Sequence, residues 1–416
     1  MKNSAFVWDP YSDQPYPIKD KAYKKYMRKK NLFDYIPLIL TNIFIYPLGV
    51  LVSPFFKGKN ENSKNFFGMS VYLEKGEEQI GLIKELGVKK LLVRMPLSDI
   101  ENIDKYVKFA AKFKECEILI NILQDRIHID DKELLKSSLI KIFEKFGNIT
   151  KEFQIGNAIN RTKWGFFSVK EYLDFYKTAY DLRNDSFKEC TLLGPSVIDF
   201  EYHFTIRALF SKYNIFFDKV SALLYVDRRG APENKQMISF DTTKKIDFLF
   251  SLASLSKRSS NKLVITESNW PISNTATYAP TSETECVSED DYARFMLRYY
   301  LLALGTKKVE TVYWHQLISA GYGLIDNRKG IRKRSAYEVY KTMLHFLDDA
   351  QILKYSNSND LYVLTCKKDN KKFDVIWLSS KKKMPVSDFS IVYDMFGKEL
   401  KENIMISENP IYAYHK

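Results

Sequence analysis

From residue 66 onward, short apolar runs alternate with longer segments in which apolar residues recur every three or four positions. Runs rich in β-branched residues are typical of buried parallel strands, whereas the 3.6-residue spacing is typical of helices that cover a sheet. The pattern predicts strands at 67–72, 90–95, 117–123, 152–155, 191–193, 220–225, 262–266 and 311–314. It predicts helices at 77–86, 100–113, 132–146, 169–182, 242–256, 290–304 and 335–347.

This alternation predicts an α/β protein with a TIM barrel, or (β/α)8 barrel, at residues 66–349. An open doubly wound sheet is the alternative, but no glycine-rich phosphate loop follows any of the predicted strands. After Asp349 three short stretches, 362–367, 372–378 and 390–393, alternate apolar and polar residues. They predict a small antiparallel, β-sandwich-like accessory domain at 350–416.

The arm formed by residues 1–65 contains a long apolar segment. Residues 35–56 carry no charge, and their length suits a helix that spans a membrane. Three prolines, Pro37, Pro47 and Pro54, together with Gly49, would interrupt a straight helix. We therefore expect a broken apolar segment that lies in a membrane surface or dips into it.

A basic cluster directly upstream strengthens this expectation. It consists of Lys21, Lys24, Lys25, Arg28, Lys29 and Lys30. Residues 19–56 are therefore predicted to bind an anionic membrane surface, and the positive-inside tendency places them on the cytoplasmic face of a bacterial inner membrane. The alternative is an apolar arm packed across the barrel, although so many charges have little use in a core. Residues 1–14 lack the apolar core of a secretory signal, so export by that route is not expected.

Composition and charge narrow the choice of partner. Hydrophobic residues make up 45% of the chain and aromatic residues 15%, which excludes a disordered protein. A net charge of +13 favours an anionic partner such as an acidic glycan, an acidic lipid or a nucleic acid. RNA-binding signatures, zinc-finger spacing and arginine-rich arms are absent, so no nucleic-acid partner is expected. The sequence also lacks metal-ligand spacing and a Ser–His–Asp arrangement, and no cofactor or metal is expected.

Polar residues follow three of the predicted strands, where a barrel opens onto its active site. They are Gly156-Asn157-Ala158 after the fourth strand, Thr266-Glu267 at the seventh and Tyr313-Trp314 at the eighth. A retaining glycosidase needs two carboxyl groups about 5–5.5 Å apart, one as nucleophile and one as acid/base. Glu267 stands where the nucleophile would be, but the place of its partner holds Ala158.

These motifs resemble the clan of retaining glycoside hydrolases with (β/α)8 barrels, and the β-xylosidase and α-iduronidase group is the nearest. The resemblance implies that Glu267 is the nucleophile and that Asn157 bonds a sugar hydroxyl near the reacting carbon. It further implies that Arg94 lies near the nucleophile, that Tyr225 orients it, and that Trp314 forms an aromatic floor beneath the sugar. A cation and a hydroxyl would hold Glu267 ionised and aligned.

The chain departs from the clan at Ala158, where the clan has glutamate. Alanine can neither protonate a leaving oxygen nor activate water, and such help is worth typically about 10²–10⁴ in rate. Three explanations are left open: a mutation that replaced the natural residue, a sugar-binding barrel without activity, or another group that acts as the acid. Candidates for that group follow the fifth strand: Asp199, Glu201 and His203. The retention of the other site residues favours an active enzyme.

Arginines near the predicted mouth indicate an acidic sugar. Arg228 and Arg229 follow the sixth strand and Arg161 follows the fourth, and guanidinium groups bind carboxylates or phosphates bidentately. The alternative is that they pair with nearby carboxylates and brace a loop. His315 could also reach the mouth, although a lone histidine in a strand is more often structural.

The sequence therefore predicts a membrane-associated glycosidase-like enzyme that acts on an anionic, lipid-linked bacterial glycan. Lipopolysaccharide core is the expected substrate class, and removal of a Kdo (3-deoxy-octulosonic acid) residue is its most specific form. The alternative is a non-catalytic barrel that binds glycan or scaffolds polysaccharide or lipopolysaccharide assembly. The sugar, its linkage, its anomeric configuration and the oligomeric state are left open.

Overall fold

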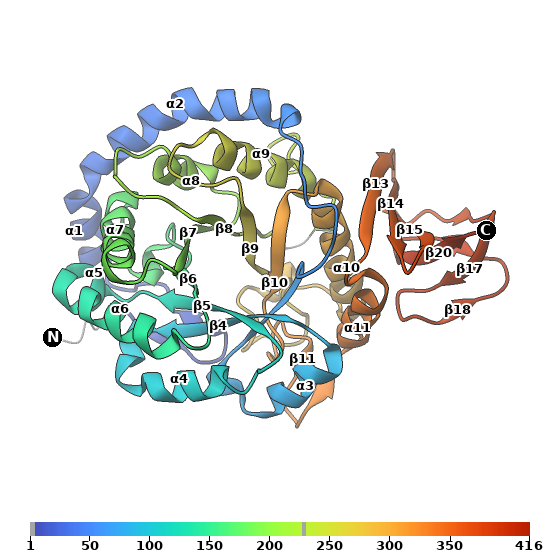
Figure 1. The fold of residues 1–416 in the computed structure, drawn as a ribbon, viewed down its shortest axis with the longest axis horizontal. Helices are drawn as coiled ribbons and strands as arrows, with labels where there is room; N and C mark the ends of the chain where they lie inside the picture. Colours follow the sequence, from blue (N-terminus) through green and yellow to red (C-terminus); the bar gives the residue numbers. More distant parts are fainter. Residues whose placement is uncertain (1–4, 227–229) are drawn as a thin grey trace.

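A closed barrel of eight parallel strands forms the centre of the computed structural model, which describes residues 5–226 and 230–416 (Figure 1). The strands are β3 (Phe67–Val71), β4 (Lys90–Pro96), β5 (Glu117–Leu123), β6 (Glu152–Ile155), β7 (Thr191–Ile198), β8 (Lys219–Leu223), β9 (Leu263–Ser268) and β10 (Val309–Trp314). Neighbours pair in chain order, and β10 closes the barrel by pairing with both β9 and β3. The predicted fold class, a TIM barrel with a C-terminal β-domain, is confirmed.

Helices cover the outside of the barrel. They are α3 (Glu78–Leu86), α4 (Ile103–Ala110), α5 (Arg126–Asp130), α6 (Lys132–Phe146), α7 (Val169–Ser186), α8 (Tyr202–Leu209), α9 (Thr242–Leu255), α10 (Glu289–Thr306) and α11 (Ser335–Leu347). Side-chain oxygens cap several N-termini, as where Asp131 accepts from the backbone of Glu133 and Leu134 at the start of α6. Short 3₁₀ segments lie at Leu73–Lys75, Leu97–Asn102, Thr162–Trp164 and Glu283–Glu285.

Side chains alternate between the barrel interior and the helices. Tyr72, Leu92, Leu119, Leu193, Val264 and Tyr313 form an apolar cluster. Because direction alternates along a strand, a residue two positions further along points the same way and nearer the carboxyl end. Arg94 therefore points into the barrel like Leu92, and His315 points into it like Tyr313. The carboxyl ends of the strands therefore present polar groups to the mouth.

The N-terminal arm wraps around the barrel instead of extending away from it. A short hairpin, β1 (Trp8–Asp9) with β2 (Gln14–Pro15), precedes α1 (Lys21–Lys30), a 3₁₀ turn (Leu32–Asp34), α2 (Tyr35–Val52) and a second 3₁₀ turn (Ser53–Phe55). In Figure 1, α2 forms an arc outside α8 and α9. Tyr46 of α2 stacks on Tyr202 of α8, with ring centroids 4.5 Å apart.

The expected interruption of the apolar segment is corrected, because α2 continues through Pro47. Pro37 lies in the first turn, where a helix needs no backbone donor. Pro47 costs the helix a hydrogen bond, roughly 3 kcal/mol. Packing of the next turn on the barrel offsets this cost, since the Gly49 carbonyl accepts from Ser251 Oγ at 3.1 Å. A β-carbon at Gly49 would lie only 2.9 Å from the Phe248 ring, so the helices approach closely.

The chain after α11 forms a six-stranded antiparallel sheet in the order β13-β14-β15-β20-β17-β18. Its strands are β13 (Gln351–Ser358), β14 (Leu361–Lys368), β15 (Lys371–Leu378), β17 (Phe389–Tyr393), β18 (Glu399–Leu400) and β20 (Ile411–His415). Two-stranded sheets are formed by β16 (Met384–Pro385) with β19 (Met405–Ile406) and by β11 (Ile325–Asp326) with β12 (Arg332–Lys333). Phe346 of α11 stacks on Tyr412 of β20, with ring centroids 4.2 Å apart, and so joins the sheet to the barrel.

Candidate active site

Glu267, near the end of β9, lies at the centre of a polar cluster in the barrel mouth. Its side chain is buried, and both carboxylate oxygens accept hydrogen bonds. The Nη2 of Arg94 donates to Oε2 at 3.0 Å, and the hydroxyl of Tyr225 donates to Oε1 at 2.6 Å. Three residues far apart in the sequence are thus brought together by the ends of β4, β8 and β9.

The surroundings of Glu267 stabilise its charged form. Burial alone would raise the pKa of this carboxyl, but His315 in its charged form, the Arg94 guanidinium and the Tyr225 hydroxyl lower it below its ordinary value. His315 lies 4.0 Å from Oε2, yet burial lowers the pKa of His315 to about 4, so the imidazole is neutral at pH 7. At neutral pH the Arg94 charge and the Tyr225 hydrogen bond therefore hold the carboxylate ionised.

Aromatic rings fix Arg94 and His315 beside the carboxylate. The Arg94 guanidinium lies over the ring of Tyr72, 4.6 Å from its centroid. The Tyr72 hydroxyl and His315 Nδ1 are hydrogen-bonded at 2.7 Å, and the imidazole stacks on Tyr322 with centroids 5.2 Å apart. The site around Glu267 is therefore held in one arrangement before any ligand enters.

Asn157 and Ala158 follow β6 and line the same pocket. Asn157 Oδ1 accepts from Asn121 and Gln154, both at 3.1 Å. Its Nδ2 is buried and has no hydrogen-bond partner in the part of the chain that the structure describes. A buried amide with an unused donor, on a residue that lines the same pocket as Glu267, suits a hydroxyl of a bound ligand.

Ala158 is fully buried among apolar groups. It clusters with Leu123, Trp164 and Leu223, and its backbone φ is +45°. The position expected for the acid is therefore an apolar wall of the pocket.

The three candidates for a relocated acid have different environments. Asp199 lines the pocket, and ion pairs join Arg161 to both Asp199 and Glu201. Glu201 also accepts from Asn160 Nδ2 at 2.8 Å and does not line the pocket. His203 is in α8, where burial lowers its pKa, and it too is absent from the lining. Only Asp199 among these three faces the site.

Two expectations about binding residues change. Trp314 is fully buried behind the pocket, where its Nε1 donates to the Tyr292 hydroxyl at 2.7 Å and its ring stacks on Trp270. It is therefore a core residue and not a floor beneath a sugar; the next residue, His315, lines the pocket instead. Arg161 lines the pocket but is already paired with carboxylates, as the alternative interpretation expected. Arg228 and Arg229 lie outside the described residues.

The N-terminal hairpin covers one side of the mouth, a feature that no pattern in the sequence indicated. Ser12, Asp13 and Gln14 line the pocket, whose free volume is about 80 Å³. The Asp13 carboxylate accepts from Tyr322 at 3.0 Å and from Gln316 at 2.8 Å, and it pairs with Lys75. The Asp13 carbonyl accepts from Arg94 at 2.9 Å, so the hairpin is part of the network that holds Glu267.

Neither the models of protein families nor the curated proteins gave a match to this sequence. Solved structures do match it. A family 39 glycoside hydrolase from Bacteroides cellulosilyticus is similar over 87% of this chain and 82% of its own, with a TM-score of 0.68 and 14% identity. The chain has a glycoside hydrolase fold. A family 39 β-xylosidase from Caulobacter crescentus covers 86% of this chain and 98% of its own, with a TM-score of 0.58 and 10% identity.

A family 30 endoxylanase from Clostridium papyrosolvens is also similar, over 86% of this chain and 98% of its own, with a TM-score of 0.57 and 11% identity. At these identities the likeness establishes the barrel and its trailing β-domain. The role of each residue has to be argued from the site itself.

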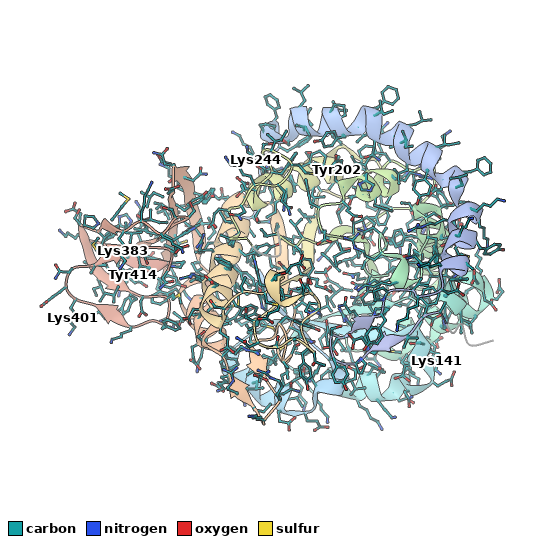
Figure 2. All side chains as sticks on the ribbon, turned by 180° about the vertical axis from the view of Figure 1, so that it is seen from behind. Lys141, Tyr202, Lys244, Lys383, Lys401 and Tyr414 are labelled. Atoms are coloured by element: carbon teal, nitrogen blue, oxygen red, sulfur yellow. The ribbon has the colours of Figure 1, made fainter. Side chains whose placement is uncertain are left out.

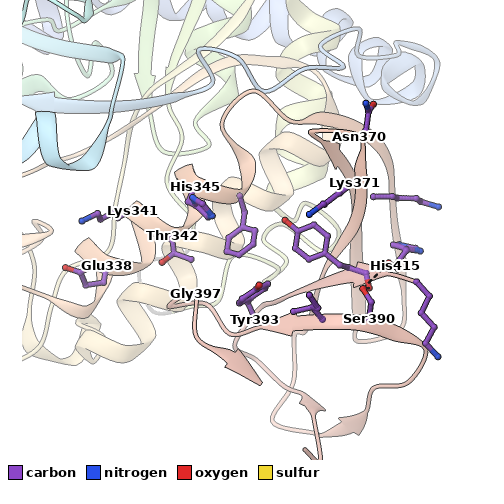
Figure 3. A pocket seen from close by; sticks show the side chains of 15 residues that line it. Glu338, Lys341, Thr342, His345, Asn370, Lys371, Ser390, Tyr393, Gly397 and His415 are labelled. Atoms are coloured by element: carbon purple, nitrogen blue, oxygen red, sulfur yellow. Dashed lines mark hydrogen bonds between the residues drawn. The ribbon is translucent and has the colours of Figure 1, made fainter. Parts of the chain in front are cut away.

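A larger hollow of about 860 Å³ lies between α11 and the C-terminal sheet (Figure 3). Lys341, His345, Lys371 and Tyr393 are among its lining residues, and none of the lining residues belongs to a barrel strand. The larger cavity is therefore not the one that contains Glu267. Among the residues that the structure describes, no group of three or more His, Cys, Asp or Glu side chains could hold a metal ion.

Proposed function

We propose that this protein is a glycoside hydrolase whose nucleophile is Glu267. The carboxylate itself carries the proposal: it is buried at a strand end, and Arg94 and Tyr225 hold it ionised and aligned. Attack on an anomeric carbon requires a carboxylate in this state. The glycoside hydrolase fold and the free amide donor of Asn157 beside the pocket support the same assignment.

In the proposed reaction an oxygen of Glu267 forms a bond to the anomeric carbon while the bond to the leaving oxygen breaks. The leaving oxygen then takes up a proton, which Ala158 cannot supply. Water next attacks the anomeric carbon, the bond to Glu267 breaks and returns the carboxylate, and the proton lost by the water passes to a base or to solvent. Asp199 lines the pocket and is the candidate donor, provided that a ligand releases it from its ion pair with Arg161. A carboxyl group on the substrate itself, or a leaving group stable as an anion, would reduce the need for a protein acid.

The proposed substrate is an anionic sugar at the end of a lipid-linked bacterial glycan, such as lipopolysaccharide core. The pocket contains Arg161 and Lys163, and a carboxylate of the substrate would bind Arg161 by displacing Asp199 from its ion pair. The hairpin at Ser12–Gln14 covers one side of the mouth, which favours a terminal residue over the interior of a chain. Release of Kdo, which carries its carboxylate on the anomeric carbon, is the most specific form of this proposal.

The second candidate function is glycan binding without hydrolysis, in which the barrel scaffolds polysaccharide or lipopolysaccharide assembly. The apolar environment of Ala158 favours it, because the wall formed by Leu123, Trp164 and Leu223 offers no group that could act as an acid. Both candidates place a sugar at Glu267, and they differ only in whether the glycosidic bond breaks.

The variant Glu267→Gln tests the catalytic proposal. Its matched control is Glu189→Gln, which changes an exposed carboxyl group elsewhere in the chain. The wild type and both variants are assayed against a panel of aryl glycosides of acidic sugars and against lipopolysaccharide core. We expect hydrolysis that is lost in Glu267→Gln and retained in Glu189→Gln. Hydrolysis that survives in Glu267→Gln would show that this carboxyl is not the nucleophile.

Ala158→Glu separates the enzyme from the binder. If the site lost its acid by substitution, a carboxyl returned to this position should raise hydrolysis of simple aryl glycosides, by up to about 10²–10⁴. Saturable binding of an acidic monosaccharide by the wild type, without turnover in the wild type or in Ala158→Glu, would instead support the binding function. Calorimetry would measure the binding of the sugar, and Glu267→Gln should change its affinity.

A further inference from the structure

The outer face of α2 is an exposed apolar surface. We call it the α2 face and define it by large side chains that are at least two-fifths exposed: Leu32, Phe33, Tyr35, Ile36, Ile39, Leu40, Ile43, Phe44, Leu48, Leu51 and Phe55. Most of them recur every three or four positions and so lie along one side of the helix. Figure 2 shows the side chains of α2 projecting away from the barrel. A contiguous apolar surface of this kind marks an interaction site on a soluble domain.

The opposite face of α2 is held to the barrel by polar contacts. Asp34, at the start of the helix, is buried and accepts from Arg207 at 2.8 Å and from the backbone of Lys170 at 2.9 Å. Asn42, in the middle, donates to the His203 carbonyl at 3.0 Å. These contacts fix the helix against α7 and α8, and the hydrogen bond from Ser251 to the Gly49 carbonyl fixes it against α9. Of the two faces of this helix, the α2 face is therefore the one available to a partner.

The helix that precedes α2 is strongly basic. The six cations of the basic cluster lie on α1, and Lys57 and Lys59 follow the other end of α2. None of the six is within ion-pair distance of a carboxylate among the described residues. Unpaired cations at both ends of an apolar face are complementary to a surface that is apolar inside and negatively charged outside.

We propose that α1 and α2 dock the protein onto the surface of an anionic lipid bilayer, with α2 lying in the plane of the membrane. The apolar side chains of the α2 face enter the boundary between headgroups and acyl chains, and the α1 cations bind acidic headgroups. One described segment, Leu32–Phe55, is long and apolar enough by length and composition to cross a bilayer. Crossing would require it to leave the barrel and break the contacts of Asp34 and Asn42, which favours docking in the plane.

Vesicle flotation of the full chain tests the proposal without reference to catalysis. The protein is mixed with vesicles of phosphatidylcholine alone or with about 30% phosphatidylglycerol. We expect binding to the anionic vesicles, at least tenfold weaker binding to the neutral ones, and release on raising the NaCl concentration, because salt screens the α1 cations. No flotation with anionic vesicles would overturn the proposal. Flotation that resists high salt would overturn docking in the plane and favour a spanning helix.

Paired variants assign the contact to the two helices. Phe44→Asp with Leu51→Asp on the α2 face should weaken binding at least tenfold, whereas Phe396→Asp, an exposed aromatic residue on the C-terminal domain, should not. The double variant Lys25→Glu with Lys29→Glu removes charge from α1 and should also weaken vesicle binding at least tenfold. Lys383→Glu with Lys401→Glu is its control and should not weaken binding; both control lysines are labelled in Figure 2.

The folded state of each variant is checked by circular dichroism, so that loss of binding is not loss of structure. Equal binding by the wild type and both helix variants would overturn the assignment. A wild-type dimer that Phe44→Asp converts to a monomer, without vesicle binding, would identify the α2 face as a protein interface and would also overturn the proposal.

Discussion

Arg94 Nη2 lies 3.0 Å from Glu267 Oε2, and both side chains are buried in the mouth of the barrel. The carboxylate keeps its charge inside the protein because this guanidinium is beside it. Arg94 also joins the N-terminal hairpin to the barrel mouth, since it donates to the Asp13 carbonyl as well. One arginine therefore supports both the candidate nucleophile and the segment that covers it.

Replacing Arg94 with methionine should destabilise the fold. The change leaves the Glu267 carboxylate buried without its cation, and breaking a buried pair in this way costs about 3–5 kcal/mol. Urea unfolding followed by circular dichroism measures the loss. The double variant Arg94→Met with Glu267→Gln should recover part of it, because no buried charge remains. Equal losses in the single and double variants would mean that the pairing does not carry the effect.

His315 should make the stability depend on pH on the acidic side of neutrality. Burial lowers its pKa from 6.5 to about 4, so the unfolded chain takes up a proton in this interval and the folded chain does not. Stability is therefore complete above about pH 6.5 and falls as the pH drops toward 4, by up to about 3 kcal/mol.

The variant His315→Gln isolates this contribution. The difference in unfolding free energy between the wild type and the variant should change across this interval and be constant above pH 7. Glu267 adds a second effect at lower pH, because its pKa is lowered by its neighbours. Its stabilising contribution is present above its ordinary value and is lost as the pH falls through its lowered pKa. A difference that is flat from pH 7 to pH 4 would contradict the assignment for His315.

Asp34 should be more important for stability than its place in a surface segment implies. Asp34→Ala leaves the Arg207 charge and the backbone donor of Lys170 without their acceptor, and we expect a loss of about 3–5 kcal/mol. Asp20→Ala is a useful comparison, because it removes an exposed cap of α1 and should cost about 1 kcal/mol. Chemical unfolding of the two variants side by side measures both values.

Asp13 should hold the hairpin in the mouth through its carboxylate. Asp13→Ala removes the acceptor for Tyr322 and Gln316 and the partner of Lys75, so we expect unfolding to become easier by roughly 1–3 kcal/mol. Asp13→Asn keeps an acceptor oxygen and should cost less. Thermal unfolding compares them, and a greater loss in Asp13→Asn than in Asp13→Ala would contradict this role for the side chain.

The sequence predicted the barrel because its signal is local and repeated. Four predicted elements, 117–123, 132–146, 152–155 and 335–347, agree with the structure residue for residue. The helix at 202–209 was missed because its 8 residues cover little more than two turns, too few for an apolar period to stand out. Strand β7 was predicted too short, since Gly194 and Pro195 read as a break in the pattern.

The candidate site was predictable where it depends on strand ends, and not where it depends on register or distant contacts. Glu267, Arg94, Tyr225 and Asn157 meet because each lies at or just beyond the carboxyl end of a strand. Trp314 was misplaced because neighbouring residues of a strand point to opposite sides, and the sequence alone does not say which of two faces inward. His315 was named but read as structural.

Asp13 contributes through a contact between the first residues of the chain and loops that follow the barrel strands. No periodicity or motif near residue 13 signals such a contact. The continuity of α2 through Pro47 was missed for a related reason, since the packing that compensates the proline comes from α9, two hundred residues away.

The position of the hairpin has a practical consequence for anyone who handles this protein. A truncated chain that starts near residue 66 would be expected to be more soluble in water, because it lacks the apolar arm. Such a truncation would also delete Ser12, Asp13 and Gln14, and with them one side of the pocket. An assay on the shortened chain would then report on an enlarged opening with Lys75 and Tyr322 uncovered. A preparation that keeps residues 1–65 is therefore the sounder one for assays of this site.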